Sequence, residues 1–450
     1  MMSILLRYCS SCRRQYFLAL FLLAAVLGGL YVLPQGQISL TLPDGDSLAG
    51  HPWQGSDVMT YVEPARSFIE TGVFARSGVP DMHRTIGYPA FLALMMWAFG
   101  DLWLPMVYIF QLFIFASFFP AVTLVIQSWF PEHKNLPSIV FGVLLLNGAA
   151  LAYAGLLLTD MLFSALLMAG MAVGLLAIRR VSWLLVFLHI GIIAWAAQVR
   201  PTLGLFAVVD VFFMIYTAKK WQLLSLSKVK LIIAISALMV LIAGNGPAAR
   251  NYINHGIFTP TNVLSNGLAR YLAGPVLIEA GRKDVFDRKL REFKSSSGVE
   301  QIEIQKKFAL EIFAAYPFLV LKRLLYHAFW NLFEPHWEYI LNVFDGGFSL
   351  NEVLDDNGQL NKKLGWGVGF WLGYLLLYGF FLVFVIRALL RGEFVLLVGL
   401  AFFLMPLLAS FMNGQGARMR LYAEPILLMF ACVEFFRVGK EKLHTFLLKS

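Results

Sequence analysis

Long apolar runs constrain this chain more than any other feature. Runs of about 20 apolar residues are followed by basic residues, as at Arg179-Arg180 and Lys219-Lys220. A helix of that length crosses the hydrocarbon of a bilayer with its backbone hydrogen bonds satisfied internally. Hydrophobic residues make up 59% of the chain and charged residues only 14%, well below the roughly 25% of soluble domains. We therefore predict an all-α polytopic membrane protein.

Basic residues also predict how the chain is oriented. The first apolar run, 16–33, follows Arg7, Arg13 and Arg14 and lacks the small-x-small cleavage pattern of a signal peptide. Lysine and arginine collect in cytoplasmic loops. Placing the basic connections inside gives about ten transmembrane helices with both termini in the cytoplasm.

This topology divides the chain into units. Residues 1–247 form an N-terminal transmembrane module whose first external loop is 34–100, residues 248–366 are an external region, and residues 367–450 form a three-span C-terminal module. Within the external region, 282–311 alternates charges and predicts a solvated helical face. The apolar, aromatic segment 316–333 carries Lys322, Arg323 and His327. We expect it to lie in the outer interface, since a crossing would put later basic residues outside.

Two acids open helices at the external boundary. Asp57 and Tyr61 are spaced i, i+4, which puts both on one helix face. Thr159-Asp160 begins a later span at the same boundary. Each acid is explained by helix capping and the helix dipole, but polar groups gathered at one bilayer face also indicate a functional site.

Cations cluster at the same boundary. His83-Arg84 precedes Gly87-Tyr88-Pro89, which we interpret as a tight turn, and further arginines end or join other spans, with Asn251 beside one of them. Arginine binds phosphate oxygens bidentately. The candidate phosphate ligands are Arg84, Arg200, Arg250, His83, Arg418 and Arg420.

Other polar features carry weaker signals. Glu334, His336 and Glu338 alternate in a way that suits a divalent cation, and the sequence leaves the need for a metal open. Asp210 lies inside an apolar span, where an acid needs a partner or a proton. The net charge of +9 comes mostly from residues at the ends of spans, so nucleic acid is not an expected partner.

The order of these motifs resembles the class C (GT-C) integral-membrane glycosyltransferases, in particular bacterial members similar to aminoarabinose transferases and protein mannosyltransferases. The family's loop acid followed by Tyr, Ala and Gly-Phe is matched here by Asp57, Tyr61, Ala65, Gly72 and Phe74. Its Arg-x-Pro-Gly-Tyr-Pro sequence is matched by residues 84–89, with Ile86 in place of the first proline.

Later motifs follow in the same order. A Thr/Ser-acid pair is matched by Thr159-Asp160, although Glu is commoner there, and an Arg-Pro pair by Arg200-Pro201. Pro-x-x-Arg-Asn followed by Gly-x-Phe-x-Pro looks like 247–251 and 256–260, and a late Arg-x-Arg resembles 418–420.

The resemblance implies a GT-C-type helix bundle with external juxtamembrane helices. It implies inverting transfer of a sugar from a polyprenyl-phosphate donor to an acceptor hydroxyl at the external, periplasmic face. Asp57 would be the general base, and Asp160 a second catalytic-site carboxylate that orients the acceptor or the sugar. The cations above would bind the donor phosphate, and Tyr61, Tyr88 and Asn251 would contact substrate. The implied location is the bacterial inner membrane.

The sequence is also compatible with two other functions. A multi-span transporter or lipid flippase would need polar residues at mid-depth, and a polysaccharide polymerase or ligase would share the external arginines. The sequence does not specify the sugar, nor whether the acceptor is a glycolipid, a glycan or a protein. It also leaves the oligomeric state open.

Overall fold

The computed structural model describes residues 16–21, 58–145, 157, 159–200, 203–296, 298–333, 362–392 and 423–447. Within these ranges the regular structure is helical apart from one short antiparallel hairpin. In the hairpin, β1 (Ala75–Arg76) pairs with β2 (Val79–Pro80). The predicted all-α class is confirmed for the described part of the chain.

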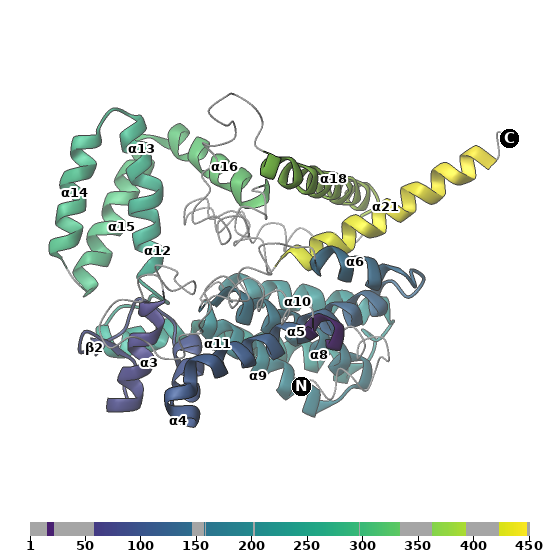
Figure 1. The fold of residues 1–450 in the computed structure, drawn as a ribbon, viewed down its shortest axis with the longest axis horizontal. Coiled ribbons are helices and arrows are strands. Elements are labelled where there is room, and N and C mark those ends of the chain that lie inside the picture. Colours follow the sequence, from purple (N-terminus) through teal and green to yellow (C-terminus); the bar gives the residue numbers. More distant parts are fainter. Residues whose placement is uncertain are drawn as a thin grey trace.

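The bundle is built around α8 (Thr159–Arg180). Its side chains are buried from Thr159 to Ile178. It packs against α5 (Trp103–Trp129), α9 (Trp183–Val199) and α10 (Leu203–Lys220), while α11 (Ser227–His255) covers α9 and α10. Figure 1 shows α5, α8, α9 and α10 running side by side in the lower half of the molecule. A helix that is apolar on every side needs such enclosure, by protein or by lipid.

A second group of helices packs beside this bundle. α18 (Lys362–Leu390) lies along α21 (Glu424–Leu447), and α21 also contacts α6 (Leu136–Leu145). An ion pair of 3.2 Å between Arg387 and the buried Glu434 joins α18 to α21.

The described helices have the length and composition of membrane spans. Three stretches are long and apolar enough to cross: Gly87–Trp129, Thr159–Arg180 and Ser227–His255. Trp183–Val199 and Leu375–Leu390 are shorter apolar helices. The chain is thus a membrane protein. The expected number of about ten spans stays a prediction, since spans such as 393–412 lie outside the described residues.

The structure corrects the prediction at two element boundaries. Gly87-Tyr88-Pro89 is the first turn of α4 (Gly87–Phe99), which leads through η2 (Gly100–Leu102) into α5, so the predicted tight turn is wrong. Proline fits there because the first turn of a helix does not use its N–H groups internally. α11 runs on to His255, past the predicted end at 247, and therefore includes Arg250 and Asn251.

Residues 263–333 fold into a helical module with its own core. It comprises α12 (Val263–Asn266), the π-helix η3 (Gly267–Ala273), α13 (Gly274–Glu279), α14 (Lys283–Ser295), α15 (Gly298–Ala315) and α16 (Pro317–Phe333). Phe286, Phe293 and Phe308 pack together inside it. The charge alternation over 282–311 predicted the solvated faces of α14 and α15 but did not reveal this core. In Figure 1 the module lies at the same end of the bundle as α3 (Met59–Thr71) and α4.

Candidate functional site

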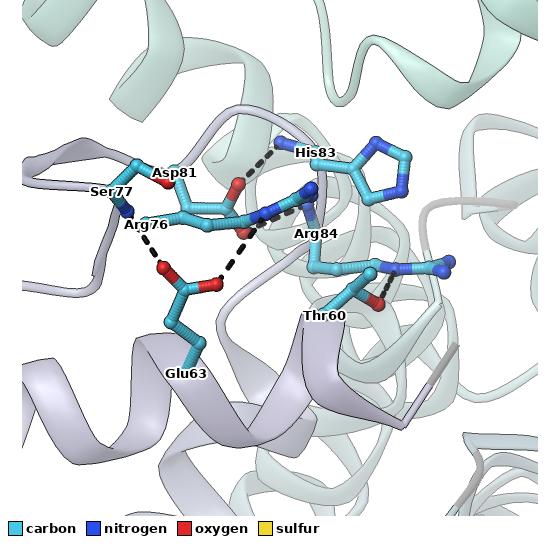
Figure 2. A network of polar contacts seen from close by, with 7 residues as sticks. All are labelled: Thr60, Glu63, Arg76, Ser77, Asp81, His83 and Arg84. Atoms are coloured by element: carbon cyan, nitrogen blue, oxygen red, sulfur yellow. Dashed lines mark hydrogen bonds and ion pairs between the residues drawn. The ribbon is translucent and has the colours of Figure 1, made fainter. Parts of the chain in front are cut away.

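A tight loop between the hairpin and α4 presents His83 and Arg84. The buried carboxylate of Asp81 accepts the backbone N–H groups of His83 at 2.8 Å and Arg84 at 3.1 Å. Aspartate commonly organises a turn in this way, by bonding the backbone N–H groups that follow it. Glu63 on α3 accepts a hydrogen bond from the backbone of Ser77 at 2.7 Å and so fixes the hairpin to the helix. Figure 2 shows this network, in which one carboxylate shapes the loop and another ties it to α3.

Arg84 reaches back to the first turn of α3. Its Nε donates to Thr60 Oγ1 at 2.8 Å (Figure 2), and its guanidinium lies 4.5 Å from the centre of the Tyr61 ring. Asp57 lies outside the described residues, whereas Val58, the next residue in the chain, is described. The structure therefore brings the Arg84 guanidinium to the helix start that Asp57 precedes.

Arg250 supports the same loop from the end of α11. Its Nη2 donates to the backbone carbonyls of Asp81 at 2.7 Å and Arg84 at 3.2 Å. Its guanidinium also donates to Asn251 Oδ1. Asn251 is fully buried, and its amide donates to the carbonyl of Thr259 at 2.7 Å. Arg250, a predicted phosphate ligand, and Asn251, a predicted substrate contact, thus bond within the protein and hold the loop that carries Arg84.

His83 links the loop to the segment that leads into the helical module. Its Nδ1 donates to Asn262 Oδ1 at 2.8 Å, and its carbonyl accepts the hydroxyl of Thr261. The backbone N–H of Asn262 donates to Met82 O at 3.1 Å. Burial, followed by the charge of Arg84, lowers the pKa of His83 below its usual 6.5. His83 is therefore a neutral donor at pH 7.

Asp160 and Arg200 form an ion pair at the same end of the bundle. Arg200 Nη1 donates to Asp160 Oδ1 at 2.5 Å, with the side chains 12% and 1% exposed. The pair joins the first turn of α8 to the residue after α9. Breaking a buried pair by removing one partner costs about 3–5 kcal/mol, so this pair fixes the position of both charges.

Aromatic and backbone contacts join these two charged groups. The Tyr61 and Tyr88 rings meet edge to face with centroids 5.2 Å apart, and the buried Tyr88 hydroxyl donates to Gln111 Oε1 at 2.8 Å. The hydroxyl of Thr85 donates to Val199 O at 3.2 Å, one residue before Arg200. The Arg84 loop is therefore fixed beside the Asp160–Arg200 pair.

Gly87 makes this close packing attainable. A Cβ at this position would overlap the backbone of Gln198 and Val199. The carbonyl of Gly87 also accepts the Trp195 indole N–H at 3.3 Å. Glycine at the start of α4 therefore lets the loop pack against the end of α9, which explains physically why Gly stands in the Arg84–Pro89 motif.

Some of the predicted site residues lie outside the part of the chain that the structure describes. Asp57, Arg418 and Arg420 lie outside the described residues, as do the candidate metal ligands Glu334, His336 and Glu338. Sequence reasoning missed Asp81, Thr60 and Asn262. Asp81 was detectable as an acid two residues before His83-Arg84, whereas the contacts of Thr60 and Asn262 arise only from tertiary folding.

A second polar pair lies deep in the bundle. His189 Nε2 is 3.1 Å from Asp210 Oδ2, and His189 Nδ1 donates to the carbonyl of Gly170 at 2.8 Å. A Cβ at Gly174 would press on the imidazole, so glycine there makes room for the ring. Asp210, the acid that we expected to need a partner, is thus paired with His189. A histidine inside an apolar span was the missed signal.

Comparison with solved structures identifies a similar fold. The archaeal oligosaccharyltransferase AglB from Archaeoglobus fulgidus, in complex with an inhibitory peptide and a dolichol-phosphate, aligns with a TM-score of 0.50 and 12% identity over 96% of this chain and 51% of that one. An apo crystal structure of the Archaeoglobus fulgidus oligosaccharyltransferase gives a TM-score of 0.49 and 13% identity, with the same two coverages.

This likeness is one of fold. It agrees with the GT-C-type bundle predicted from the sequence. The chain spans about half the length of these structures, 51%. No family model matches the chain, and neither does any curated protein.

Proposed function

We propose that this protein is a GT-C glycosyltransferase that transfers a sugar from a polyprenyl-phosphate donor to an acceptor hydroxyl at the external face of the membrane. The proposal joins two lines of support, the ordered motifs of the sequence and the fold shared with AglB. AglB was solved with a dolichol-phosphate, which supports a lipid phosphate as the donor's carrier. We place the protein in a bacterial inner membrane, with the site facing the periplasm.

One observation carries the proposal furthest. Arg84 is fixed by Thr60 and Tyr61 at the start of α3, a helix that begins two residues after Asp57 in the sequence. Group transfer from a lipid phosphate requires a base for the acceptor proton and a cation for the departing phosphate. We propose that Asp57 is this base and Arg84 this cation.

The reaction follows from these two groups. The acceptor oxygen attacks the anomeric carbon from the side opposite the phosphate, which inverts the configuration. The bond from that carbon to the phosphate oxygen breaks, and the phosphate leaves with the electron pair. Asp57 accepts the acceptor proton, a contribution of typically 10²–10⁴-fold. Arg84 stabilises the charge on the phosphate by preorganised electrostatics.

The remaining predicted ligands take supporting roles. Arg250, Asn251 and His83 position the Arg84 loop, because their side chains bond to the loop and to the segment 259–262. Asp160 orients the sugar or acceptor through its fixed contact with Arg200. Arg418 and Arg420 remain proposed phosphate ligands, and the need for a divalent metal stays open.

The test is mass spectrometry of lipid-linked sugars and envelope glycans in cells carrying Asp57→Asn. Glu70→Gln is the matched control, an exposed acid on α3, the helix that follows Asp57 in the sequence. If the proposal holds, Asp57→Asn removes one sugar from a glycan and its polyprenyl-phosphate donor accumulates, while Glu70→Gln changes neither. The glycan that changes also identifies the acceptor as glycolipid, polysaccharide or protein.

Unchanged profiles, with normal amounts of folded Asp57→Asn protein in the membrane, would contradict the proposal. A transporter or flippase would then be favoured, and the His189–Asp210 pair would become its first candidate polar element at mid-depth. Accumulation of a diphosphate-linked glycan, instead of a monophosphate-linked sugar, would favour a polymerase or ligase.

A further inference from the structure

Two buried oxygen atoms in the bundle make no hydrogen bond with the described residues. They are Oδ1 of Asp210 on α10 and Oγ of Ser236 on α11. Asp210 is 5% exposed and Ser236 0%, and the other carboxylate oxygen of Asp210 contacts His189 Nε2. An unpaired buried polar atom is costly, and native proteins satisfy nearly all such atoms with protein groups or ordered water.

Asp210 and Ser236 lie at the same depth of the bundle. α10 and α11 pack against each other and are joined by the short connection 221–226, so they run antiparallel. Asp210 is ten positions before Lys220, the last residue of α10. Ser236 is nine positions after Ser227, the first residue of α11. At about 1.5 Å per residue, both residues lie about 14–15 Å from the connection.

A contact between α9 and α11 gives a similar depth for His189. The Gln198 side chain donates to the carbonyl of Ala243 at 3.2 Å. α9 and α11 run in the same direction, because α10 returns between them. His189 is nine residues before Gln198 on α9. Ser236 is seven residues before Ala243 on α11, so His189 and Ser236 differ in height by only about 3 Å.

The Ser236 side chain is on the buried face of α11. Ile232 and Val240, one turn to either side, are buried with it. α11 packs against α9 and α10, the two helices that carry His189 and Asp210. The Ser236 hydroxyl therefore lies on the side of α11 that is directed toward this pair.

We propose that a water molecule binds between Asp210 Oδ1 and Ser236 Oγ. The two oxygens do not hydrogen-bond to each other, so one bridging molecule satisfies both. A buried water uses about 2–4 polar partners, and it donates to the carboxylate while the hydroxyl either donates or accepts.

Water is favoured over a metal cation at this position. The described residues contain no group of three or more His, Cys, Asp or Glu that could hold a metal ion. A cation among apolar helices needs an opposite charge, and the carboxylate of Asp210 already contacts His189.

The bound water adds a fourth helix to the polar contacts at mid-depth. His189 and Asp210 connect α8, α9 and α10, and Ser236 adds α11. The far end of α11 carries Arg250, which donates to the carbonyl of Arg84. The water thus helps to fix the helix that supports the Arg84 loop. This inference concerns the interior of the bundle and does not depend on the proposed chemistry.

An experimental structure of the full-length protein in lipid, at a resolution that shows ordered water, tests the site directly. We expect one density peak about 2.6–3.2 Å from both Asp210 Oδ1 and Ser236 Oγ. The proposal would be overturned by the absence of a peak there, or by a protein atom in its place. A direct hydrogen bond between the two side chains would also overturn it, as would a peak with shorter contacts to several oxygens, which indicates a cation.

The variant Ser236→Ala gives a second test, in which the sign of the effect decides. If a water is bound, the variant removes one of its partners, and the melting temperature in lipid nanodiscs falls by about 2 °C. If the hydroxyl is unpaired, its removal relieves a desolvation cost, and an unchanged or higher melting temperature overturns the proposal. Ser225→Ala, at an exposed serine in the connection before α11, is the matched control and should leave the melting temperature unchanged.

Discussion

Polar side chains are buried at two depths of this bundle, and they bond to different kinds of partner. At mid-depth, His189 and Asp210 bond to each other and to the carbonyl of Gly170, and so join α8, α9 and α10. At the end nearest α3, Asp81 and Arg250 bond to loop backbone and so shape a loop. The deep pair holds helices against one another, whereas the outer network positions a cation.

The deep pair also has a fixed proton count. The carbonyl of Gly170 only accepts, so His189 Nδ1 carries a hydrogen. The contact from Nε2 to Asp210 Oδ2 then requires one further proton between the two atoms. The pair as a whole is neutral, as an apolar surrounding demands. Because the pair joins three helices and its net charge is zero, we interpret it as a structural element, although the buried Asp210 Oδ1 has no hydrogen-bond partner among the described residues.

Breaking the deep pair should give the largest loss of stability. His189→Leu or Asp210→Leu leaves an unpaired polar group in the bundle, which costs about 3–5 kcal/mol. The melting temperature in detergent, followed by tryptophan fluorescence, measures the effect. The double variant should recover much of the loss, because replacing both partners by apolar residues is often close to neutral. A double variant as unstable as the sum of the singles would show that the two residues do not act as a pair.

Removing Arg84 should affect turnover instead of stability. Arg84→Ala deletes a preorganised cation, and losses of about 10²–10³-fold are typical for such donors. Sugar transfer in proteoliposomes is the measurement, with melting as the check on folding. Arg66→Ala is the matched control, an exposed arginine on α3. If Arg84→Ala lost stability as the deep-pair variants do while transfer per folded molecule stayed normal, the contrast between the two regions would be wrong.

Gly87→Ala should disturb the outer region alone, with an intermediate effect. The added methyl overlaps the backbone at the end of α9, and overpacking typically costs about 1–3 kcal/mol. We expect a lower melting temperature and slower sugar transfer, because the Arg84 loop shifts away from Arg200. Gly191→Ala on α9 is the control, since a Cβ there meets nothing within 4 Å. Equal behaviour of the two variants would mean that the close approach at Gly87 is unimportant.

The sequence predicted the class of fold and the end of the bundle where charge collects. Apolar length and basic flanks depend on local composition, so they are readable without a structure. Asp160 and Arg200 were both identified, but their ion pair joins residues 40 positions apart, and no local pattern encodes it. The same limit applies to Arg250, which the sequence predicted as a phosphate ligand. Its contacts with Asp81 and Arg84 form only when α11 packs against the first loop, so the sequence alone did not reveal them.

The predicted helix boundaries were wrong for a related reason. Gly87 and Pro89 usually mark turns, yet here they begin α4, because proline suits the first turn of a helix and glycine admits the end of α9. The core of the helical module was hidden as well. Phe286 and Phe293 lie seven positions apart on an otherwise highly charged helix, and two aromatic residues make a weak apolar stripe. Their burial depends on Phe308, which comes from another helix.

The smallest effect should be the pH dependence that His83 gives to the outer network. His83 is held neutral by its surroundings: burial, Arg84 and Arg76 lower its pKa, while Asn262 and Asp81 raise it by less. A pKa below the unfolded value of 6.5 means that the unfolded chain binds more protons in that range. Stability from this residue is therefore complete above pH 6.5 and falls as the pH drops toward the folded pKa.

His83→Gln keeps a hydrogen-bond donor for Asn262 but does not titrate. Melting curves from pH 7.5 down to about 5 should therefore lose part of their slope in this variant. Sugar transfer should lose the same part of its acid sensitivity, because the contacts of His83 hold the Arg84 loop to Thr261 and Asn262, the residues just before the helical module. Identical slopes for wild type and variant would show that a group other than His83 titrates in this range.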